Sequence, residues 1–157
     1  MKDIIIRQAN RDDAQTIHEL HTESVTELCK GYYSDDLIHG WIGNRTPANY
    51  FSVIDQNKLF VAIKDSEIVG FGSAVPGEVE RLYVSPYHVN SGIGSLLLGQ
   101  AMMIALVNSC KVIVVSTLNA EGFYSKRGFI SVEKITTRHG SVDLPCILME
   151  YKPDSKL

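Results

Sequence analysis

A segment with two closely spaced glycines offers the clearest chemistry in this sequence. Gly92 and Gly94 follow residues 78–85, which alternate as a β-strand does, and they precede an apolar run at helical spacing. Glycines at such a junction let successive backbone N–H groups point the same way, and the dipole of the next helix adds partial positive charge. The pattern therefore predicts a site for a phosphate or pyrophosphate that needs no basic side chain.

Two widespread phosphate-binding motifs do not fit this segment. A P-loop needs Gly-Lys-Ser or Gly-Lys-Thr after the glycines, and none follows them here. A dinucleotide fingerprint needs a small residue where Leu97 stands and an acidic residue at the end of the next strand, residues 112–116. This disfavours a nicotinamide-dependent oxidoreductase. A shorter Gly-x-Gly turn that binds an acyl carrier remains, beside the alternative of an ordinary turn that opens a helix.

Two carboxylates begin the strand before these glycines. Glu80 lies two residues after Glu78, so a regular strand places both on the same face as Leu82 and Val84. Partial burial and mutual repulsion would raise their pKa values toward the range that suits a general base. The alternative is that one or both lie at a solvated strand start after Gly77. Glu78 is the slightly better candidate for a base.

The elements that must position these residues can be followed by their spacing. Strands are expected at residues 4–6, 59–63, 68–75, 78–85, 112–116, 130–137 and 142–151, and helices at about 17–28, 35–42, 91–106 and 120–126. Residues 43–56 are expected to be irregular. This order predicts an α/β fold with a mixed central sheet of about seven strands and helices on both faces, of which only part can be parallel.

Composition excludes several classes of protein. The chain has 157 residues, of which 45% are hydrophobic and 21% charged, so a single folded domain is expected. Its 15 basic and 18 acidic residues give a formal net charge of −3. Such a chain has no bulk field to attract nucleic acid or an anionic membrane, so neither is expected as a partner.

Cysteine and histidine usage bears on compartment and metals. The three cysteines, Cys29, Cys110 and Cys146, form no CxxC pair and cannot all pair within the chain. No apolar stretch is long enough to span a bilayer. A cytoplasmic protein is therefore expected. The histidines lack metal-ligand spacing, and no metal is expected.

Two motifs carry a resemblance to a known family. The first, Leu82-Tyr83-Val84-x-Pro86 followed by Gly92-Ile93-Gly94-x-x-Leu97-Leu98, resembles the acetyl-CoA motif of the GNAT superfamily of N-acetyltransferases. The second, Asn119-Ala120-x-x-Phe123-Tyr124-x-Lys126-x-Gly128-Phe129, resembles a later motif of that superfamily. The resemblance implies a GNAT-type fold in one domain, residues 1–157, with acetyl-CoA as cosubstrate.

The resemblance also implies which residues contact the cofactor. They are Leu82, Tyr83, Val84, Val89, Asn90, Ser91, Gly92, Ile93, Gly94, Ser95, Asn119 and Tyr124. Val89 stands where relatives usually have Arg or Gln, and Asn90 stands where they often have Gly. This departure bears on the affinity for CoA more than on the identity of the cofactor. His88 is a candidate substitute donor. Asn119 is also expected to cap the short helix.

The family's reaction implies further roles. Direct attack by a primary amine on the thioester needs a base that takes a proton from the amine, and Glu78 and Glu80 are the candidates. It also needs an acid that protonates the departing thiolate of CoA, and Tyr124 matches the family tyrosine with this role. Tyr32 and Tyr33 fall in a region that borders the acceptor in relatives; a surface aromatic patch or a homodimer contact is the alternative. The acceptor is expected to be a small molecule or a peptide. A non-catalytic acyl-CoA-binding or sensing module is the rival function.

Overall fold

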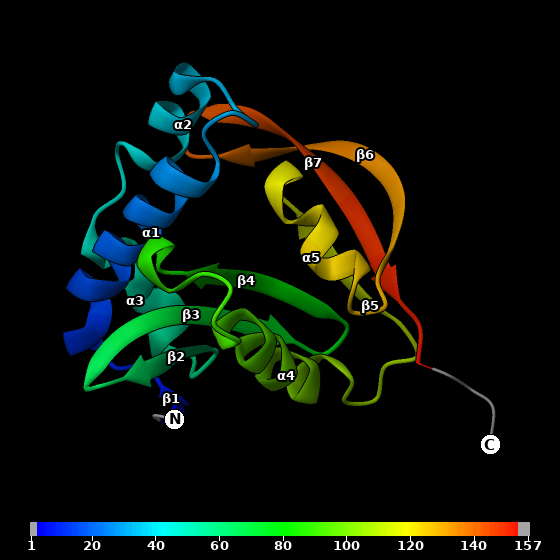
Figure 1. The fold of residues 1–157 in the computed structure, drawn as a ribbon, viewed down its shortest axis with the longest axis horizontal. Coiled ribbons are helices and arrows are strands. Elements are labelled where there is room, and N and C mark those ends of the chain that lie inside the picture. Colours follow the sequence, from blue (N-terminus) through cyan, green and yellow to red (C-terminus); the bar gives the residue numbers. More distant parts are fainter. Residues whose placement is uncertain (1–2, 154–157) are drawn as a thin grey trace.

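A seven-stranded sheet with the order β1-β2-β3-β4-β5-β7-β6 runs through the computed structural model, which describes residues 3–153 (Figure 1). The strands are β1 (Ile5–Gln8), β2 (Leu59–Lys64), β3 (Glu67–Val75), β4 (Glu78–Val84), β5 (Val112–Ser116), β6 (Ile130–His139) and β7 (Val142–Tyr151). The α-helices are α1 (Ala14–Leu28), α2 (Asp35–Ile42), α3 (Phe51–Asp55), α4 (Ile93–Ala105) and α5 (Glu121–Ser125). Short 3-10 turns are η1 (Arg11–Asp13), η2 (Pro47–Tyr50), η3 (Pro86–His88) and η4 (Leu118–Ala120).

Helices cover both faces of the sheet, as the sequence predicted. On one face, Leu97 of α4 packs in a buried cluster with Val114 of β5. On the other, Ile17 of α1 packs with Phe71 of β3, and Trp41 of α2 belongs to a third cluster that reaches β7. Among the described strands, β4 and β5 form the parallel pair and the remaining pairs are antiparallel. The mixed sheet and its limited parallel part are therefore confirmed.

The two parallel strands separate soon after they meet. β4 pairs with β5 only at Glu78 with Ile113 and at Val79 with Val114. Beyond Val79, β4 stays with β3 while β5 stays with β7, and Figure 1 shows the two halves of the sheet diverging. The edge of β4 that faces β5 is therefore left without a strand partner over residues 81–84, and its polar backbone groups are available to something else.

A β-bulge in β4 corrects the expected arrangement of the two carboxylates. Val79 pairs with Ala74 and Arg81 with Ser73, so Glu80 is an extra residue in the ladder. The bulge shifts the alternation of side chains by one position. Val79, rather than Glu78 or Glu80, therefore shares the α4 face of the sheet with Leu82 and Val84, all of which pack in the same cluster. The prediction that both acids share that face was wrong.

Two other boundaries differ from the sequence prediction. Residues 43–56, which were expected to be irregular, contain η2 and α3. Thr46 and Asn49 form a capping box with Pro47 at the first helical position, and Tyr50 is buried against the sheet. Helix α4 begins at Ile93 rather than near residue 91, because its N-cap, Gly92, has a left-handed φ of 86°.

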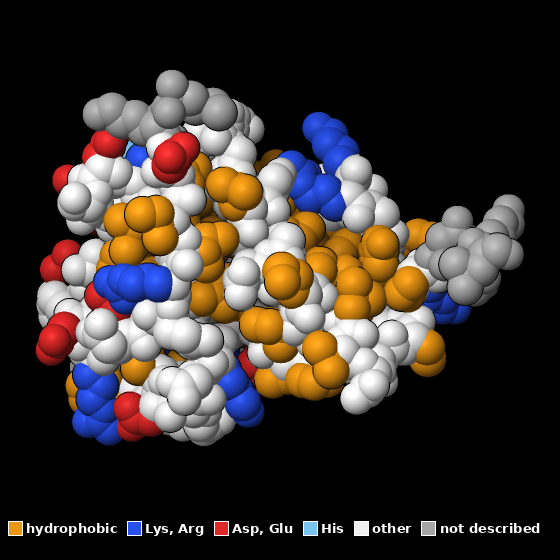
Figure 2. Space-filling model, turned by 90° about the horizontal axis from the view of Figure 1, so that it is seen from below, with side chains coloured by type: hydrophobic (Ala, Val, Ile, Leu, Met, Phe, Trp, Pro, Cys, Tyr) orange, Lys and Arg blue, Asp and Glu red, His pale blue; other side chains and the backbone are white. Residues whose placement is uncertain are grey.

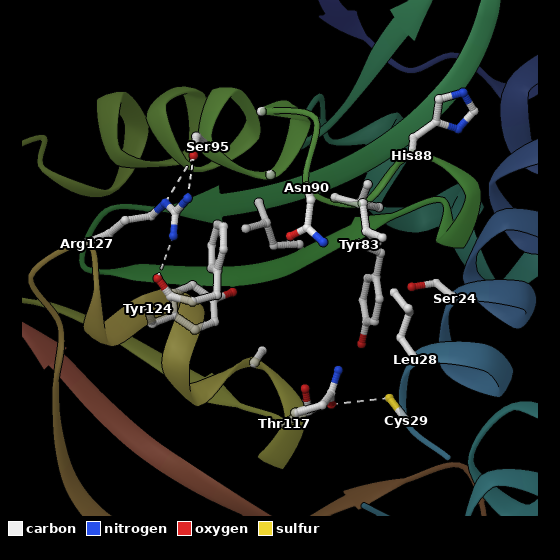
Figure 3. Close-up of a pocket in the computed structure, with 18 of the residues that line it drawn as sticks. Ser24, Leu28, Cys29, Tyr83, His88, Asn90, Ser95, Thr117, Tyr124 and Arg127 are labelled. Atoms are coloured by element: carbon white, nitrogen blue, oxygen red, sulfur yellow. Dashed lines mark hydrogen bonds between the residues drawn. The ribbon is translucent and has the colours of Figure 1, made fainter. Parts of the chain in front are cut away.

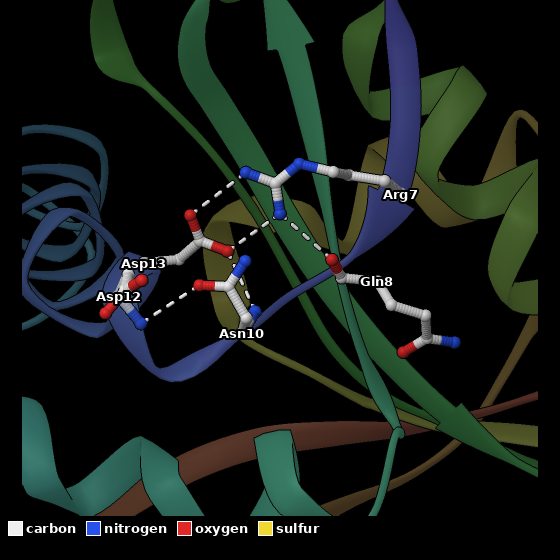
Figure 4. A network of polar contacts seen from close by, with 5 residues as sticks. All are labelled: Arg7, Gln8, Asn10, Asp12 and Asp13. Atoms are coloured by element: carbon white, nitrogen blue, oxygen red, sulfur yellow. Dashed lines mark hydrogen bonds and ion pairs between the residues drawn. The ribbon is translucent and has the colours of Figure 1, made fainter.

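A polar network joins β1 to the start of α1 (Figure 4). Both carboxylate oxygens of Asp13 accept hydrogen bonds from Arg7, at 2.8 and 3.0 Å, and one also accepts from the Asn10 N–H at 2.9 Å. The Asn10 side chain in turn accepts from the Asp12 N–H at 3.0 Å. The Arg7 guanidinium holds the pKa of Asp13 below its ordinary value. This network sets where α1 enters, and α1 later contributes to the candidate site.

The outer side of α4 is apolar. Leu96 and Met103 of α4 are 47% and 73% exposed, and Val107, in the turn after the helix, is 50% exposed. Figure 2 looks at the molecule from below and shows hydrophobic side chains gathered on the right-hand half of this face. None of the helices within residues 3–153 combines the length and hydropathy needed to cross a membrane.

Candidate active site

A cavity of about 450 Å³ opens where β4 and β5 separate (Figure 3). Its lining comes from three segments that are distant in sequence. They are α1 with the turn after it (Ser24, Leu28, Cys29, Tyr32), β4 with the following loop and the first turn of α4 (Leu82, Tyr83, Val84, His88, Val89, Asn90, Gly92, Gly94, Ser95), and the segment after β5 (Thr117, Asn119, Ala120, Phe123, Tyr124, Arg127). The cavity thus combines both sequence motifs in one site.

The loop before α4 has the backbone geometry of an anion site. Asn90 and Gly92 have left-handed φ values of 60° and 86°, and the N-terminus of α4 follows directly. Alternation of left-handed and ordinary residues turns neighbouring N–H groups to the same side. A Cβ at Gly92 would meet nothing within 4 Å, whereas one at Gly94 would lie 3.0 Å from the Phe123 ring. Gly92 is thus required by its φ, and Gly94 by close packing against α5.

Two polar side chains of this loop point in different directions. Figure 3 shows the Asn90 amide directed into the cavity, while the His88 imidazole is turned away from its centre. The His88 Nδ1 is buried without a hydrogen-bond partner among the described residues. Ser91 and Ile93 are not among the lining residues: the Ser91 hydroxyl donates to the His88 carbonyl, and the Ile93 side chain is fully buried.

Arg127 brings a positive charge to the mouth of the cavity. Its Nε and Nη2 donate to the Ser95 hydroxyl at 3.1 and 2.6 Å, and Nη1 donates to the Phe123 carbonyl at 2.9 Å (Figure 3). The guanidinium carbon lies 3.9 Å from the centroid of the Phe123 ring. Arg127 therefore links α5 to the first turn of α4, beside the glycine loop.

Two tyrosines reach the cavity from opposite sides. Tyr83 comes from β4 and Tyr124 from α5, and both also line a smaller cavity of about 40 Å³ between β4 and β5. Burial raises the pKa of each hydroxyl above its ordinary value. Both hydroxyls are therefore protonated near neutral pH and can donate hydrogen bonds.

The two carboxylates of β4 are placed differently. Glu80, the bulged residue, lines the smaller cavity, while Glu78 lines neither. Glu78 is half-buried, and desolvation, followed by the nearby Glu80 charge, raises its pKa. The smaller cavity shares Leu82, Tyr83, Thr117, Ala120 and Tyr124 with the larger one, so Glu80 lies at the far end of one continuous site.

Asn119 does not cap α5. The N-cap of that helix is Ala120, which makes no side-chain cap, and Asn119 lies within the 3-10 turn η4. Its Oδ1 instead accepts a hydrogen bond from the Cys29 thiol at 3.4 Å. Desolvation raises the pKa of Cys29 to about 12, so this thiol stays protonated. The pair connects the end of α1 to the segment after β5.

The two adjacent tyrosines after α1 have separate positions. Tyr32 is 57% exposed and lines the larger cavity, but Tyr33 is 6% exposed and lines neither cavity. The Tyr33 hydroxyl donates to the Pro145 carbonyl at 2.7 Å and accepts from the Leu118 N–H at 3.0 Å. These bonds hold the α1–α2 connection against β7 and η4.

Several lining residues were missed at the sequence level. Arg127 follows a short helix, where its positive charge alone would account for it. The sequence signal for its position at the cavity is its spacing of four residues from Phe123, which lets the guanidinium reach back over the ring. Ser24, Leu28, Cys29 and Thr117 carry no motif, and only the fold brings them together. Within residues 3–153, no cluster of three or more His, Cys, Asp or Glu side chains could hold a metal ion.

Comparison with known proteins places this site in a family. The family model described as an acetyltransferase (GNAT) domain matches residues 55–131, which include both motifs. A spermidine N(1)-acetyltransferase of Thermoplasma acidophilum is 30% identical over 142 residues, covering 80% of this chain and 88% of that protein.

Solved structures agree with this assignment. A GCN5-related N-acetyltransferase of Rhodopseudomonas palustris superposes with a TM-score of 0.88 at 22% identity, covering 97% of each chain. The PaiA N-acetyltransferase of Thermoplasma acidophilum, solved in complex with coenzyme A, has a TM-score of 0.77 at 26% identity, covering 96% of this chain and 99% of that one. This chain therefore belongs to the GNAT superfamily of N-acetyltransferases and is an acetyl-CoA-dependent acyltransferase.

Proposed function

We propose that this enzyme, as one catalytic domain, transfers the acetyl group of acetyl-CoA to a primary amine by direct attack of the amine on the thioester. The observation that carries the proposal is the continuous site between β4 and β5. An anion-binding loop lies at one end, two buried tyrosines in the middle and Glu80 at the other end. A phosphate-bearing acyl donor and an amine acceptor fit opposite ends of such a site.

The loop before α4 is proposed to hold the pyrophosphate of CoA. The N–H groups from Asn90 to Ser95 offer donors to it, and the helix dipole of α4 adds partial positive charge. Ser91 and Ile93 act through their backbone alone, since neither side chain reaches the cavity. Arg127 supplies a charge that the loop itself lacks, because its guanidinium has N–H donors beyond those bound to Ser95 and Phe123.

The open edge of β4 is proposed to receive the pantetheine arm. Leu82, Tyr83 and Val84 line the larger cavity where β4 has no partner on its β5 side. Amides of an extended arm can pair with a free strand edge as another strand would. This places the thioester near the junction of the two cavities, where a backbone N–H of β4 can stabilise charge on the carbonyl oxygen.

A carboxylate of β4 is proposed to take the proton of the attacking amine. Glu80 has the more direct access, because it lines the smaller cavity. Glu78 has the pKa raised by desolvation, which suits a base that works near neutral pH. Their separate positions around the bulge mean that one acts at the amine and the other through its charge, and substitution distinguishes them.

Tyr124 is proposed to stabilise the departing thiolate by donating a hydrogen bond. Burial raises the pKa of its hydroxyl well above that of an ordinary thiol, which is roughly 8.5. Complete proton transfer from this hydroxyl to the sulfur is therefore unfavourable, whereas a hydrogen bond that strengthens as charge develops is favourable. Tyr83 lines the same junction and is a second donor of this kind.

Direct attack, rather than an acyl-cysteine intermediate, is supported by the state of the thiols. Cys29 lines the larger cavity, but its raised pKa of about 12 leaves almost no thiolate near neutral pH. Cys146 is buried outside both cavities, and Cys110 is exposed outside them. Among the described cysteines, none is an activated nucleophile at the site.

Two measurements test the proposal. CoA should raise the melting temperature by mass action, and ATP or NAD should not match it. A panel of primary amines should then accelerate CoA release from acetyl-CoA above the rate of hydrolysis, with the acetylated amine found by mass spectrometry. CoA release that no amine accelerates, together with tight CoA binding, would refute amine acetylation and favour a sensing role.

A further inference from the structure

A group of basic side chains lies on the α1 face of the sheet, around the buried ring of Tyr50. Arg45, from the segment between α2 and η2, lies over the Tyr50 ring, with its guanidinium carbon 4.8 Å from the ring centroid. Its Nε donates to the Tyr50 hydroxyl at 3.2 Å. Within residues 3–153, no ion pair joins Arg45 to an Asp or Glu side chain. Its remaining N–H groups are free for a ligand.

His21 of α1 extends this arrangement toward β4. The Tyr50 hydroxyl and the His21 Nδ1 share a hydrogen bond of 2.7 Å, and the His21 and Tyr83 rings lie with centroids 4.3 Å apart. The side chain of His21 is 5% exposed, and its Nε2 is buried without a hydrogen-bond partner among the described residues. An unpaired buried nitrogen is costly unless something pairs with it in the working complex.

Arg81 brings a second guanidinium from β4, where it pairs with Ser73 of β3. Its Nη1 donates to the buried Ser73 hydroxyl at 3.0 Å, and the side chain lines the smaller cavity. Glu80 offers the nearest carboxylate oxygen, but at 3.9 Å this lies at the outer limit of an ion pair. Neither guanidinium is therefore neutralised by a close carboxylate within the described chain.

Electrostatic effects on neighbouring groups agree with this geometry. Desolvation, followed by the charges of Arg45 and Arg81, lowers the pKa of His21 to about 3 and also lowers that of His139, which comes from β6. No carboxylate is among the groups that shift either histidine. Acidic groups lie instead at the bulge, where Glu78 and Glu80 interact with Arg81.

The charges of Arg45 and Arg81 both act on His21, Tyr50 and Tyr83, so an anion bound close to these side chains would be attracted by both guanidiniums. We propose that the acceptor of this enzyme is a primary amine that also carries a carboxylate, and that Arg45 and Arg81 hold this carboxylate. The inference rests on the proposed acetyl transfer. The carboxylates of β4 then face the amine end of a zwitterionic substrate, and the guanidiniums face its acid end.

This substrate class differs from the one named for a relative. A polyamine, the substrate in the name of the Thermoplasma acidophilum relative, would bring a second positive charge toward Arg45 and Arg81. Repulsion then acts against productive binding of polyamines here. Arg45 and Arg81 thus present positive charge to the distal end of the acceptor, which suits a carboxylate rather than a second ammonium group.

The test compares acceptors of matched carbon chain. Acetyl transfer is measured for ω-amino acids of increasing length, each against the alkylamine and the diamine of the same length, and for α-amino acids against their α-amides. We expect kcat/KM to be highest for the carboxylate-bearing member, by about tenfold or more, because charge-assisted hydrogen bonds are lost in the others. Butyrate, which has no amine, should inhibit competitively against the best acceptor, whereas butylamine at equal concentration should inhibit less.

Variants assign the effect to the two arginines. Arg45→Gln and Arg81→Gln should each reduce the preference for the carboxylate-bearing acceptor by about tenfold, and Arg45→Lys should retain part of it. Arg11→Gln is the matched control, because Arg11 also lies over an aromatic ring, Phe51 at 4.4 Å, but its guanidinium is already paired with the carboxylate of Asp55. Melting temperature and CoA binding report whether each variant is folded.

The outcomes separate this inference from the proposed function. If diamines or alkylamines are better acceptors than amino acids in the wild-type enzyme, the carboxylate inference is overturned while acetyl transfer to amines stands. A preference for amino acids that both folded variants keep would overturn the assignment to Arg45 and Arg81. If no amine is acetylated at all, the proposed function itself fails.

Discussion

Replacement of Arg127 by Gln should weaken CoA binding without unfolding the protein. The Arg127 guanidinium lies at the mouth of the larger cavity, bonded to Ser95 and to the Phe123 carbonyl. These three hydrogen bonds use three of the five N–H groups of the guanidinium, so Nη1 and Nη2 each have one N–H left to donate to a phosphate oxygen. Gln removes the charge and those donors while leaving the glycine loop and α4 in place.

The magnitude follows from the exposure of the side chain. A hydrogen bond to a charged group contributes about 1.5–3 kcal/mol, but Arg127 is exposed, so solvent and salt reduce its effect to the lower end. We therefore expect a loss of about 1.5 kcal/mol, or roughly tenfold in Kd. The melting temperature of the ligand-free protein should change little, because an exposed cation–π contact with Phe123 contributes only about 0.5–1 kcal/mol.

Isothermal titration calorimetry with CoA at low and high salt measures this effect. Lys126→Gln is the matched control, because it removes the same charge from the adjacent residue, which lines neither cavity. The difference between the two variants should shrink as salt rises. Titration with 3′-dephospho-CoA shows which phosphate is contacted. Equal Kd values for Arg127→Gln and Lys126→Gln would refute a direct contact and leave only a long-range charge effect.

Three further substitutions test the remaining roles. Tyr124→Phe should lower kcat by about 10²-fold or more, because the hydrogen bond to sulfur forms mainly in the transition state. The Kd of CoA should stay near the wild-type value. An unchanged kcat with the same amine would show that Tyr124 has no catalytic role. Because burial raises the pKa of Glu78, its basic form is lost as pH falls through a value above that of an ordinary Glu. If Glu78 is the base, the wild-type rate should fall on the acid side of a pH–rate profile, and the defect of Glu78→Gln relative to wild type should be largest above that pKa and shrink below it. If the bulged residue is the base, the larger defect should appear in Glu80→Gln. The same raised pKa means that the folded wild type binds more protons than the unfolded chain above the ordinary Glu pKa, so wild-type stability should fall relative to Glu78→Gln as pH rises through that window. Tyr33→Phe should lower the free energy of unfolding, measured by urea denaturation, by about 1–3 kcal/mol, because it leaves the Pro145 carbonyl and the Leu118 N–H without their hydrogen-bond partner. A loss near zero would mean that water replaces the hydroxyl.

Local patterns in the sequence determined most of the elements and one half of the site. Strand β5 has the predicted bounds, residues 112–116, because a short β-branched run between polar residues has few alternatives. The glycine loop was predicted correctly as the entry to α4, because only glycine takes a φ of 86° at Gly92 without strain. The segment that contains η2 and α3 was missed, since a helix of five residues has too weak a periodicity to detect.

Tertiary structure alone decided how the chemistry-bearing residues face one another. The bulge at Glu80 places Leu82 and Val84 on the face of Val79 rather than on the face that a regular strand would have shared with the two carboxylates. A bulge depends on the pairing of β3 with β4 rather than on the sequence of β4 alone. Arg45, His21 and Arg81 come from three elements distant in the chain, and no spacing rule connects them. Only the packing of α1 and η2 over β4 brings their charges together, because Coulomb interactions depend on distance in space and not on separation along the chain.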